Sequence, residues 1–200
     1  FGWSINLSSD GKTLAVGGFY GELGSATDNA GYVKIYENTN GSFSQVGDTL
    51  YGDDISGDEF GFSVDLSSDG SIVAISSAQG GDVFIYQRNG SSWSQLGGKI
   101  AFNDYSSDIK DGSVGKEEAV VQVKISEDGN YVAIGCPISD VGGTNTGKIS
   151  VFKNISQNWV KVGDDINGEN LDHLGTYIDI EEDSNDAVSY THLTLPTTKQ

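Results

Sequence analysis

Residues 60–70 read FGFSVDLSSDG, and residues 1–11 read FGWSINLSSDG, so the chain contains nearly the same phrase twice. The phrase returns in more divergent form as AVVQVKISEDG at 119–129 and as LGTYIDIEEDS at 174–184. Aligned on the Asp-Gly turn, the copies are twice separated by 59 residues, at Asp10, Asp69 and Asp128, and Asp183 follows 55 residues later. A tandem repeat of this period indicates a repeated supersecondary unit.

Each full copy contains four strand-like segments. The first alternates apolar and polar residues, as at Phe62, Val64 and Leu66, which is the pattern of a half-buried strand. The second reads TLAVG, IVAIS or YVAIG, and the third reads GYVKIY, GDVFIY or GKISVF. The fourth carries an aromatic residue followed three residues later by Val-Gly or Leu-Gly. Four short strands in such a unit are typical of a β-propeller blade.

The sequence therefore predicts an all-β fold, a partial β-propeller of consecutive four-stranded antiparallel blades, with about three blades and the start of a fourth. We place these repeats at 1–59, 60–118 and 119–173, with the fourth beginning at 174–187. The chain opens inside its own repeat, so we expect a fragment whose neighbouring blades lie beyond both ends. A blade buries its faces only against its neighbours, so the faces without a neighbour are expected to be exposed.

The composition restricts the classes of partner. The formal net charge is −18, which argues against nucleic acid and anionic membrane surfaces, because both require basic patches. No apolar run approaches the roughly 20 residues of a membrane span, so we expect no membrane insertion. The single cysteine, Cys136, allows no internal disulfide and is expected to be a small packed residue.

The C-terminal segment has a different character from the repeats. Residues 188–197 read VSYTHLTLPT, which resembles the translation of a widely used transposase sequencing adapter in one reading frame. The fourth repeat also stops at DSNDAV, where its next strand should be apolar. We therefore predict that 188–200 is a non-native tail and exclude it, with His192, from functional reasoning.

The repeated phrase also indicates a family. FG-x-S-V, an Asp-Gly turn, an AI strand and G-x-V-x-I-Y together resemble the FG-GAP repeats of integrin α-subunit-like propellers, over essentially all of residues 1–187. The likeness is greatest to the variant in large bacterial and algal secreted proteins, which has a Trp in its last strand. The competing likeness is to WD-type propellers, whose DGK-x-L-A-x-G and closing aromatic strand are similar. Against it stand the longer period, the Phe-Gly start and the lack of a Trp-Asp dipeptide.

In calcium-binding members of the FG-GAP family, the first hairpin turn reads Asp-x-Asp/Asn-x-Asp-Gly-x-x-Asp, which gathers oxygen ligands around one cation. Each copy here lacks part of that set. Leu14, Val73 and Ala187 replace the last carboxylate in the first, second and fourth copies, and Lys124 replaces the first ligand in the third. We therefore predict no metal site at these turns, and no cofactor.

No catalytic constellation is recognisable, so we predict no catalytic residues. There is no Gly-x-Ser-x-Gly elbow, GGTNTGK at 142–148 lacks the strand and helix of a phosphate loop, and His173 reads as a solvated surface residue. The candidates for ligand binding are the irregular insertions at 19–30, 98–119 and 136–146, because propeller connections gather on one face. Their candidate side chains are Phe19, Tyr20, Glu22, Asp28, Asp140 and Asn145.

These observations favour a non-catalytic interaction module, outside the cell or at its surface, that binds a protein or glycan through its face loops. The extracellular location follows from the resemblance together with the acidity and the low cysteine content. One alternative is the propeller part of a larger secreted polysaccharide hydrolase or lyase, with its active site outside this chain. A second alternative is a WD-type intracellular scaffold.

Overall fold

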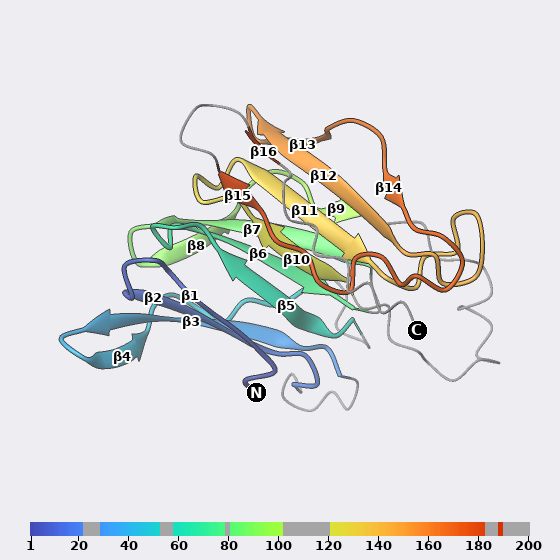
Figure 1. The fold of residues 1–200 in the computed structure, drawn as a ribbon. Helices are drawn as coiled ribbons and strands as arrows, with labels where there is room; N and C mark the ends of the chain where they lie inside the picture. Colours follow the sequence, from blue (N-terminus) through green and yellow to red (C-terminus); the bar gives the residue numbers. More distant parts are fainter. Residues whose placement is uncertain (22–28, 53–57, 79–80, 102–120, 183–187, 190–200) are drawn as a thin grey trace.

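Three four-stranded antiparallel sheets, one for each full repeat, stack side by side (Figure 1). The structure is a computed structural model that describes residues 1–21, 29–52, 58–78, 81–101, 121–182 and 188–189. This arrangement confirms the predicted all-β fold, a partial β-propeller built from consecutive antiparallel blades. Within the described ranges, the chain forms no long apolar helix of the kind that crosses a bilayer.

The strands of each sheet follow one another in chain order. The first sheet consists of β1 (Ser4–Leu7), β2 (Thr13–Gly18), β3 (Tyr32–Thr39) and β4 (Ser42–Gln45). The second consists of β5 (Phe60–Leu66), β6 (Ile72–Ser77), β7 (Asp82–Asn89) and β8 (Ser92–Gln95). The third consists of β10 (Gln122–Ile125), β11 (Tyr131–Cys136), β12 (Lys148–Ile155) and β13 (Asn158–Lys161). Their registers match, since Asn6, Asp65 and Lys124 each pair with the alanine of the second strand.

The outer strand of each sheet is interrupted at the Val-Gly or Leu-Gly and then resumes, which the sequence analysis did not foresee. Beyond the break, β9 (Ile100–Ala101) pairs with β7, and β14 (Ile166–Asn167) pairs with β12. In the first sheet, Leu50 makes the equivalent bridge to Val33. The bulge needs a residue with positive φ, which the glycines Gly47, Gly97 and Gly163 supply.

The core lies between the sheets rather than within any one of them. Ala15, Ala74 and Ala133, the small residues in register in the second strands, each lie in the cluster between their own sheet and the next repeat. The cluster between the first two sheets contains Ala15, Val33, Ile35, Val46, Phe60, Val64, Leu66, Val73, Ile75 and Phe84. The cluster between the second and third contains Ile72, Ala74, Val83, Ile85, Leu96, Ile100, Val121, Val123, Ile125, Val132, Ile134 and Cys136.

The glycine at the second position of a repeat approaches the preceding sheet closely in two of the junctions. Gly61 has φ +88°. If Gly17 carried a Cβ, that atom would lie only 2.1 Å from the carbonyl oxygen of Gly61. Gly175 and Gly135 repeat this contact at the start of the fourth repeat. In the second sheet the place of Gly17 is taken by Ser76, and the repeat that follows begins Ala-Val instead of Phe-Gly.

The fourth repeat begins on the far face of the third sheet. Leu174 and Ile178 are buried there against Ala133, Ile149 and Val151. Further along the chain, β15 (Glu181–Glu182) pairs antiparallel with β16 (Val188–Ser189). The remainder of 188–200 lies outside the described residues, so the adapter origin of this tail stays a prediction, as do the repeat boundaries at 59/60, 118/119 and 173/174.

Candidate functional site

The sheets present two ends with different connections. At the turn end lie the Asp-Gly turns between first and second strands, at residues 8–12, 67–71 and 126–130. At the connection end lie the loops between second and third strands and the linkers between sheets, described at 19–21, 29–31, 51–52, 58–59, 137–147 and 168–174. The antiparallel strand order places all of these described connections at one end. Of the loop candidates, residues 19–21, 29–30 and 136–146 lie there, whereas most of 98–119 is outside the described residues.

A network of three hydrogen bonds builds each Asp-Gly turn. Ser8 Oγ donates to Asp10 at 2.8 Å and accepts from the Thr13 N–H at 2.9 Å, and Asp10 accepts from the Lys12 N–H at 3.0 Å. The turn at Ser67 and Asp69 repeats these bonds, and so does the turn at 126–130. The Ser-x-Asp-Gly sequence thus supplies a structural cap, because the carboxylate satisfies donors of its own turn.

The carboxylates of Asp10 and Asp69 are held in their charged form. The Lys12 ammonium, with the Lys12 N–H and the Ser8 hydroxyl, lowers the pKa of Asp10 to about 2. For Asp69, burial acts to raise the pKa, but hydrogen bonds from Ser71 and Ser67 outweigh it and the pKa falls below its usual value. These carboxylates therefore remain ionised well below neutral pH.

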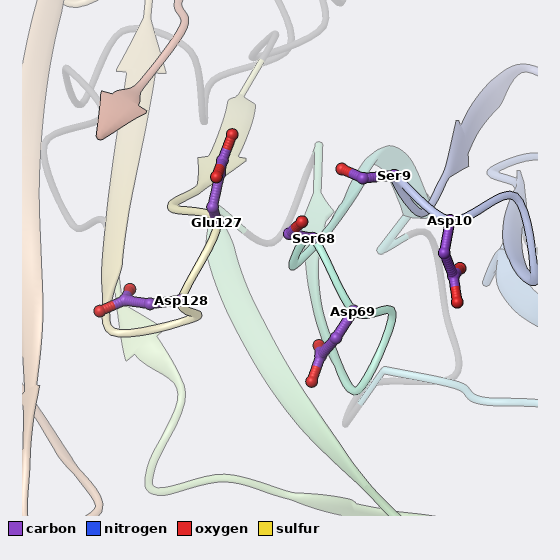
Figure 2. A pocket seen from close by; sticks show the side chains of 6 residues that line it. All are labelled: Ser9, Asp10, Ser68, Asp69, Glu127 and Asp128. Atoms are coloured by element: carbon purple, nitrogen blue, oxygen red, sulfur yellow. The ribbon is translucent and has the colours of Figure 1, made fainter. Parts of the chain in front are cut away.

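The three turns together line an open hollow of about 520 Å³. The Ser9 N–H donates to the Ser68 carbonyl at 3.0 Å, and the Ser68 N–H donates to the Glu127 carbonyl at 2.9 Å, so the turns are joined in a row. Figure 2 shows the acidic side chains spread along this row rather than converging on one point. Among the residues that the structure describes, no group of three or more His, Cys, Asp or Glu is placed to hold a metal ion. The hollow is lined by Ser9, Asp10, Ser68, Asp69, Glu127 and Asp128.

The inner strands are joined by side chains at the first ligand position of the calcium pattern. Asn6 Nδ2 donates to Asp65 Oδ1 at 2.7 Å, and Lys124 Nζ donates to the same oxygen at 3.1 Å. The other carboxylate oxygen, Asp65 Oδ2, accepts from the Ile125 N–H at 2.9 Å, and Asn6 Oδ1 accepts from the Leu66 N–H at 3.1 Å. These side chains reach sideways to the neighbouring sheet instead of inward to a cation.

Asp65 is the central group of this chain of bonds and is 5% exposed. Burial raises its pKa, and Asp179 of the fourth repeat adds to the rise. The Lys124 ammonium and the Ile125 N–H oppose this effect without cancelling it. A buried carboxylate is tolerated here because three donors surround it.

At the connection end, the first candidate loop divides between core and surface. Phe19 is 5% exposed, and its ring centroid lies 4.6 Å from that of Trp3 and 5.5 Å from that of Phe62, so its side chain packs inside the molecule. Tyr20 is 49% exposed and is accessible to a ligand. Glu22 and Asp28 lie outside the described residues, so their role stays a prediction.

In the third repeat, Asp140 and Asn145 shape one loop. Asp140 is exposed, and its carboxylate accepts from the Asn145 N–H at 2.7 Å. Asn145 has φ +47°, a conformation that Asn tolerates better than most residues, and its carbonyl accepts from the His173 N–H at 3.1 Å. Asn29 has φ +48° and accepts from the Glu59 N–H in the same way. The recurrence in two repeats indicates that Asn145 supports the loop.

The loop at 137–147 is bonded to the linker at 168–174. Thr144 accepts from the Leu171 N–H at 2.9 Å, and the Thr144 N–H donates to Asn170 Oδ1 at 2.9 Å. Two apolar side chains stand exposed on this pair of segments, Val141 at 41% and Leu171 at 60%. The sequence analysis missed both, although Leu171 stands among acids in ENLDHLG, an unusual place for an apolar residue.

Cys136 and His173 have the burial that the sequence analysis expected, one packed and the other at the surface. Cys136 is buried, and burial raises the pKa of its thiol to about 11, so the thiol is a packed and unreactive group at neutral pH. His173 is exposed at the connection end.

The stacked four-stranded sheets define the chain as a segment of a β-propeller. No protein-family model matches the sequence, that of the FG-GAP repeat included, and no curated protein sequence matches it. The fold is similar to a proposed 6-phosphogluconolactonase of Bacteroides fragilis NCTC 9343, with a TM-score of 0.54 and 15% identity, over 82% of this chain and 38% of that protein. A second such structure, from Bacteroides uniformis ATCC 8492, gives 0.52 and 18%, over 82% of this chain and 40% of the other.

The chain therefore spans about two fifths of the length of these structures. At this level of sequence identity, the similarity establishes the fold alone. It places the three sheets as consecutive blades of a larger β-propeller architecture.

Proposed function

We propose that the chain is part of a non-catalytic FG-GAP-like propeller that acts outside the cell or at its surface and binds a protein or glycan through its connection end. The observation that carries this proposal is the bonded pair of segments at 137–147 and 168–174. Its backbone is fixed by hydrogen bonds between Thr144, Asn170 and Leu171, while Val141 and Leu171 project into solvent. Apolar groups on a preorganised backbone lose little entropy on binding.

The FG-GAP-like assignment is supported by the role of the Phe-Gly start. Gly61 and Gly175, with φ of +88° and +98°, lie against a glycine of the preceding repeat, which accounts for the glycine at the second position of these two repeats. The extracellular location rests on this assignment and on the net charge of −18. Charge of this magnitude keeps a protein soluble and disfavours polyanionic partners.

The enzyme alternative has less support from this chain. The two Bacteroides structures are named for lactone chemistry, but at 15% and 18% identity that chemistry does not extend to this chain. Hydrolysis of 6-phosphogluconolactone by the purified chain, abolished by a substitution at the connection end, would contradict the non-catalytic proposal.

The proposal is tested on an array of defined glycans and an array of purified extracellular protein domains. Tyr20→Ala and Leu171→Asp should each weaken a captured partner by roughly tenfold, because exposed Tyr and Leu anchors carry much of an interface. Lys12→Ala at the turn end serves as the matched control and should leave binding unchanged. Thermal unfolding checks that all three variants keep their fold. Binding that survives both substitutions, or that is lost only in the control, would overturn the assignment to the connection end.

A further inference from the structure

One face of the first sheet is exposed where the same face of the other two sheets is buried. Trp3, Ile5 and Leu7 of the first repeat are 60%, 62% and 51% exposed. Their equivalents in the second repeat are 5–7% exposed, and those in the third are 0–5% exposed, in each case against the preceding sheet. We call the surface formed by Trp3, Ile5 and Leu7 the leading face; in Figure 1 no sheet is stacked on it. Trp3 lies at its margin, since part of its ring contacts Phe19 and Phe62, with ring centroids 4.6 and 5.9 Å away.

The leading face also has hydrogen-bond donors in a fixed register. In the second and third sheets, N–H groups on the free edge of the inner strand donate to side chains of the preceding sheet. Leu66 donates to Asn6 Oδ1 at 3.1 Å, and Ile125 donates to Asp65 Oδ2 at 2.9 Å. In the first sheet the equivalent donor is the Leu7 N–H. Among the described residues, no side chain is placed to accept it.

A third equivalence lies in the outer strand. Trp159 packs on Gly97 of the preceding sheet and donates from Nε1 to the Leu96 carbonyl at 2.9 Å, and Trp93 packs on Gly47 in the same place. Phe43 holds this position in the first sheet and is 47% exposed. The leading face therefore lacks three matching elements: an apolar cover, an inner-strand acceptor and an outer-strand glycine.

We propose that the leading face is a docking surface for a further four-stranded blade of this same repeat type. That blade presents small or β-branched residues at the positions of Ala15, Val33 and Ile35, because these cover Val64 and Leu66 in the second sheet. At the position of Asn6 and Asp65 it presents a side-chain oxygen that accepts from Leu7. At the position of Gly47 it presents a glycine that receives Phe43. The proposal is independent of any ligand at the connection end.

Two other occupants fit less well. A second copy stacked head to tail would have to offer the far face of its third sheet, but Leu174 and Ile178 of the same chain cover that face. Two copies joined face to face would bring the Leu7 N–H groups together without an acceptor, which is costly in a buried interface. Only a preceding blade supplies oxygen acceptors and apolar cover in one register.

The test extends the chain with a probe blade of known sequence. A copy of residues 1–59 is joined to Phe1, which reproduces the junction before Phe60, because both repeats start with Phe-Gly. Trp3 of the added copy is replaced by Phe, and a parallel variant in which the original Trp3 is also Phe gives the fluorescence of Trp93 and Trp159, so that the difference reports on the original Trp3. We expect acrylamide quenching of the original Trp3 to decrease and exchange of the original Leu7 amide to slow by roughly tenfold or more.

A matched control separates packing from hydrogen bonding. With Asn6→Leu in the added copy, the original Trp3 should remain protected from quenching, while the protection of the Leu7 amide should be lost. An added copy that folds apart from the chain or stays unfolded, with Trp3 and Leu7 unchanged, would overturn the proposal. Sedimentation of the unextended chain as a dimer in which Trp3 is protected would also overturn it, since the occupant would then be a second copy.

Discussion

The Lys124 ammonium on the third sheet donates a hydrogen bond, at 3.1 Å, to the Asp65 carboxylate on the second sheet. The same oxygen accepts from Asn6 of the first sheet, so one carboxylate joins three consecutive sheets. The three residues stand 59 residues apart, at one position of the repeat. An acid at all three places would bring like charges together, and the series Asn, Asp, Lys avoids that repulsion.

Removing the carboxylate should destabilise the stack of sheets. Asp65→Leu leaves the buried Ile125 N–H without its acceptor, so we expect the free energy of unfolding to fall by about 1–3 kcal/mol. The cost stays below that of a fully buried ion pair, because the Lys124 side chain is 35% exposed and can turn to water. Urea unfolding followed by tryptophan fluorescence measures the loss.

A double-mutant cycle with Lys124→Met isolates the pair. Lys124→Met alone leaves a buried carboxylate with fewer donors, whereas in the Asp65→Leu background no charge remains to be stranded. The double variant should therefore lose less stability than the two single variants together, with a coupling on the order of 1 kcal/mol. Strict additivity in the cycle would show that the ion pair contributes nothing beyond its separate groups.

The raised pKa of Asp65 makes this junction sensitive to pH. A carboxyl whose pKa is higher in the folded state than its ordinary 3.8 favours folding most when protonated, and that contribution is lost as pH rises through the folded pKa. Lys124 opposes the rise, so Lys124→Met should raise the Asp65 pKa further. The stability difference between wild type and Lys124→Met should therefore grow as pH increases from about 4 to 8, which urea titrations at several pH values would reveal. A constant difference across that range would contradict the assignment.

A second pair of equivalent positions carries opposite charges in the second and third sheets. Asp82 pairs with Lys99 at 2.6 Å in the second sheet, while the equivalent places in the third hold Lys148 and Asp165. Burial lowers the pKa of Lys148, and Asp165 opposes this. Lys148→Asp should cost about 2–4 kcal/mol of unfolding free energy, because it places a second acid at a buried position near the half-buried Asp165.

Rebuilding the second-sheet arrangement should restore much of that loss. The reversal requires Asp165→Lys together with Lys161→Gln, because Lys161 lies 2.6 Å from Asp165 and Gln95 holds its place in the second sheet. We expect this triple variant, measured by thermal and urea unfolding, to recover at least half of the stability lost by Lys148→Asp alone. A triple variant that is less stable than the single one would show that the two sheets are not interchangeable at this position.

The fold was predictable from the sequence because the information is local and repeated. Alternation in the first strand, the Asp-Gly turn and the in-register alanines each occur three times. Because all three recur at the same spacing of 59 residues, they support one another as evidence for the repeated unit. The resumed outer strand was missed because β9 and β14 contain only two residues each, too few for a periodic pattern. The positions of β9 and β14 depend on the bulge that precedes each of them, and the only sign of that bulge in the sequence is a glycine.

The candidate site was predictable in location but not in detail. The described residues 19–21 and 29–30 and the loop at 136–146 do lie at one end, yet Phe19 packs against Trp3 and Phe62, because its apolar ring is buried in a cluster with Phe62 and Ala78. Asn145 is a binding candidate from its place in an irregular insertion, and its positive φ gives it a role in the backbone of that loop. The Asn6–Asp65–Lys124 series joins residues about 59 apart in the chain, and only the stacking of sheets brings them together.

The glycine contact between sheets offers a graded test of packing. Gly98→Ala should leave stability within about 0.5 kcal/mol, because its φ is ordinary and nothing lies within 4 Å of the added Cβ. Gly11→Ala also meets open space, but its φ of +71° should cost about 1 kcal/mol. Gly17→Ala has no backbone strain of that kind, yet its Cβ would lie 2.1 Å from the Gly61 carbonyl oxygen, so we expect a loss of about 2–4 kcal/mol.

The order of the three variants separates steric contact from backbone conformation. All three remove one glycine and add one methyl group, so differences in the unfolded chain largely cancel. Thermal and urea unfolding should rank their unfolding free energies as Gly98→Ala above Gly11→Ala above Gly17→Ala. If Gly17→Ala were as stable as Gly98→Ala, the first and second sheets would have to lie farther apart than the Gly17–Gly61 contact requires, and the stacking of blades through Phe-Gly would be wrong.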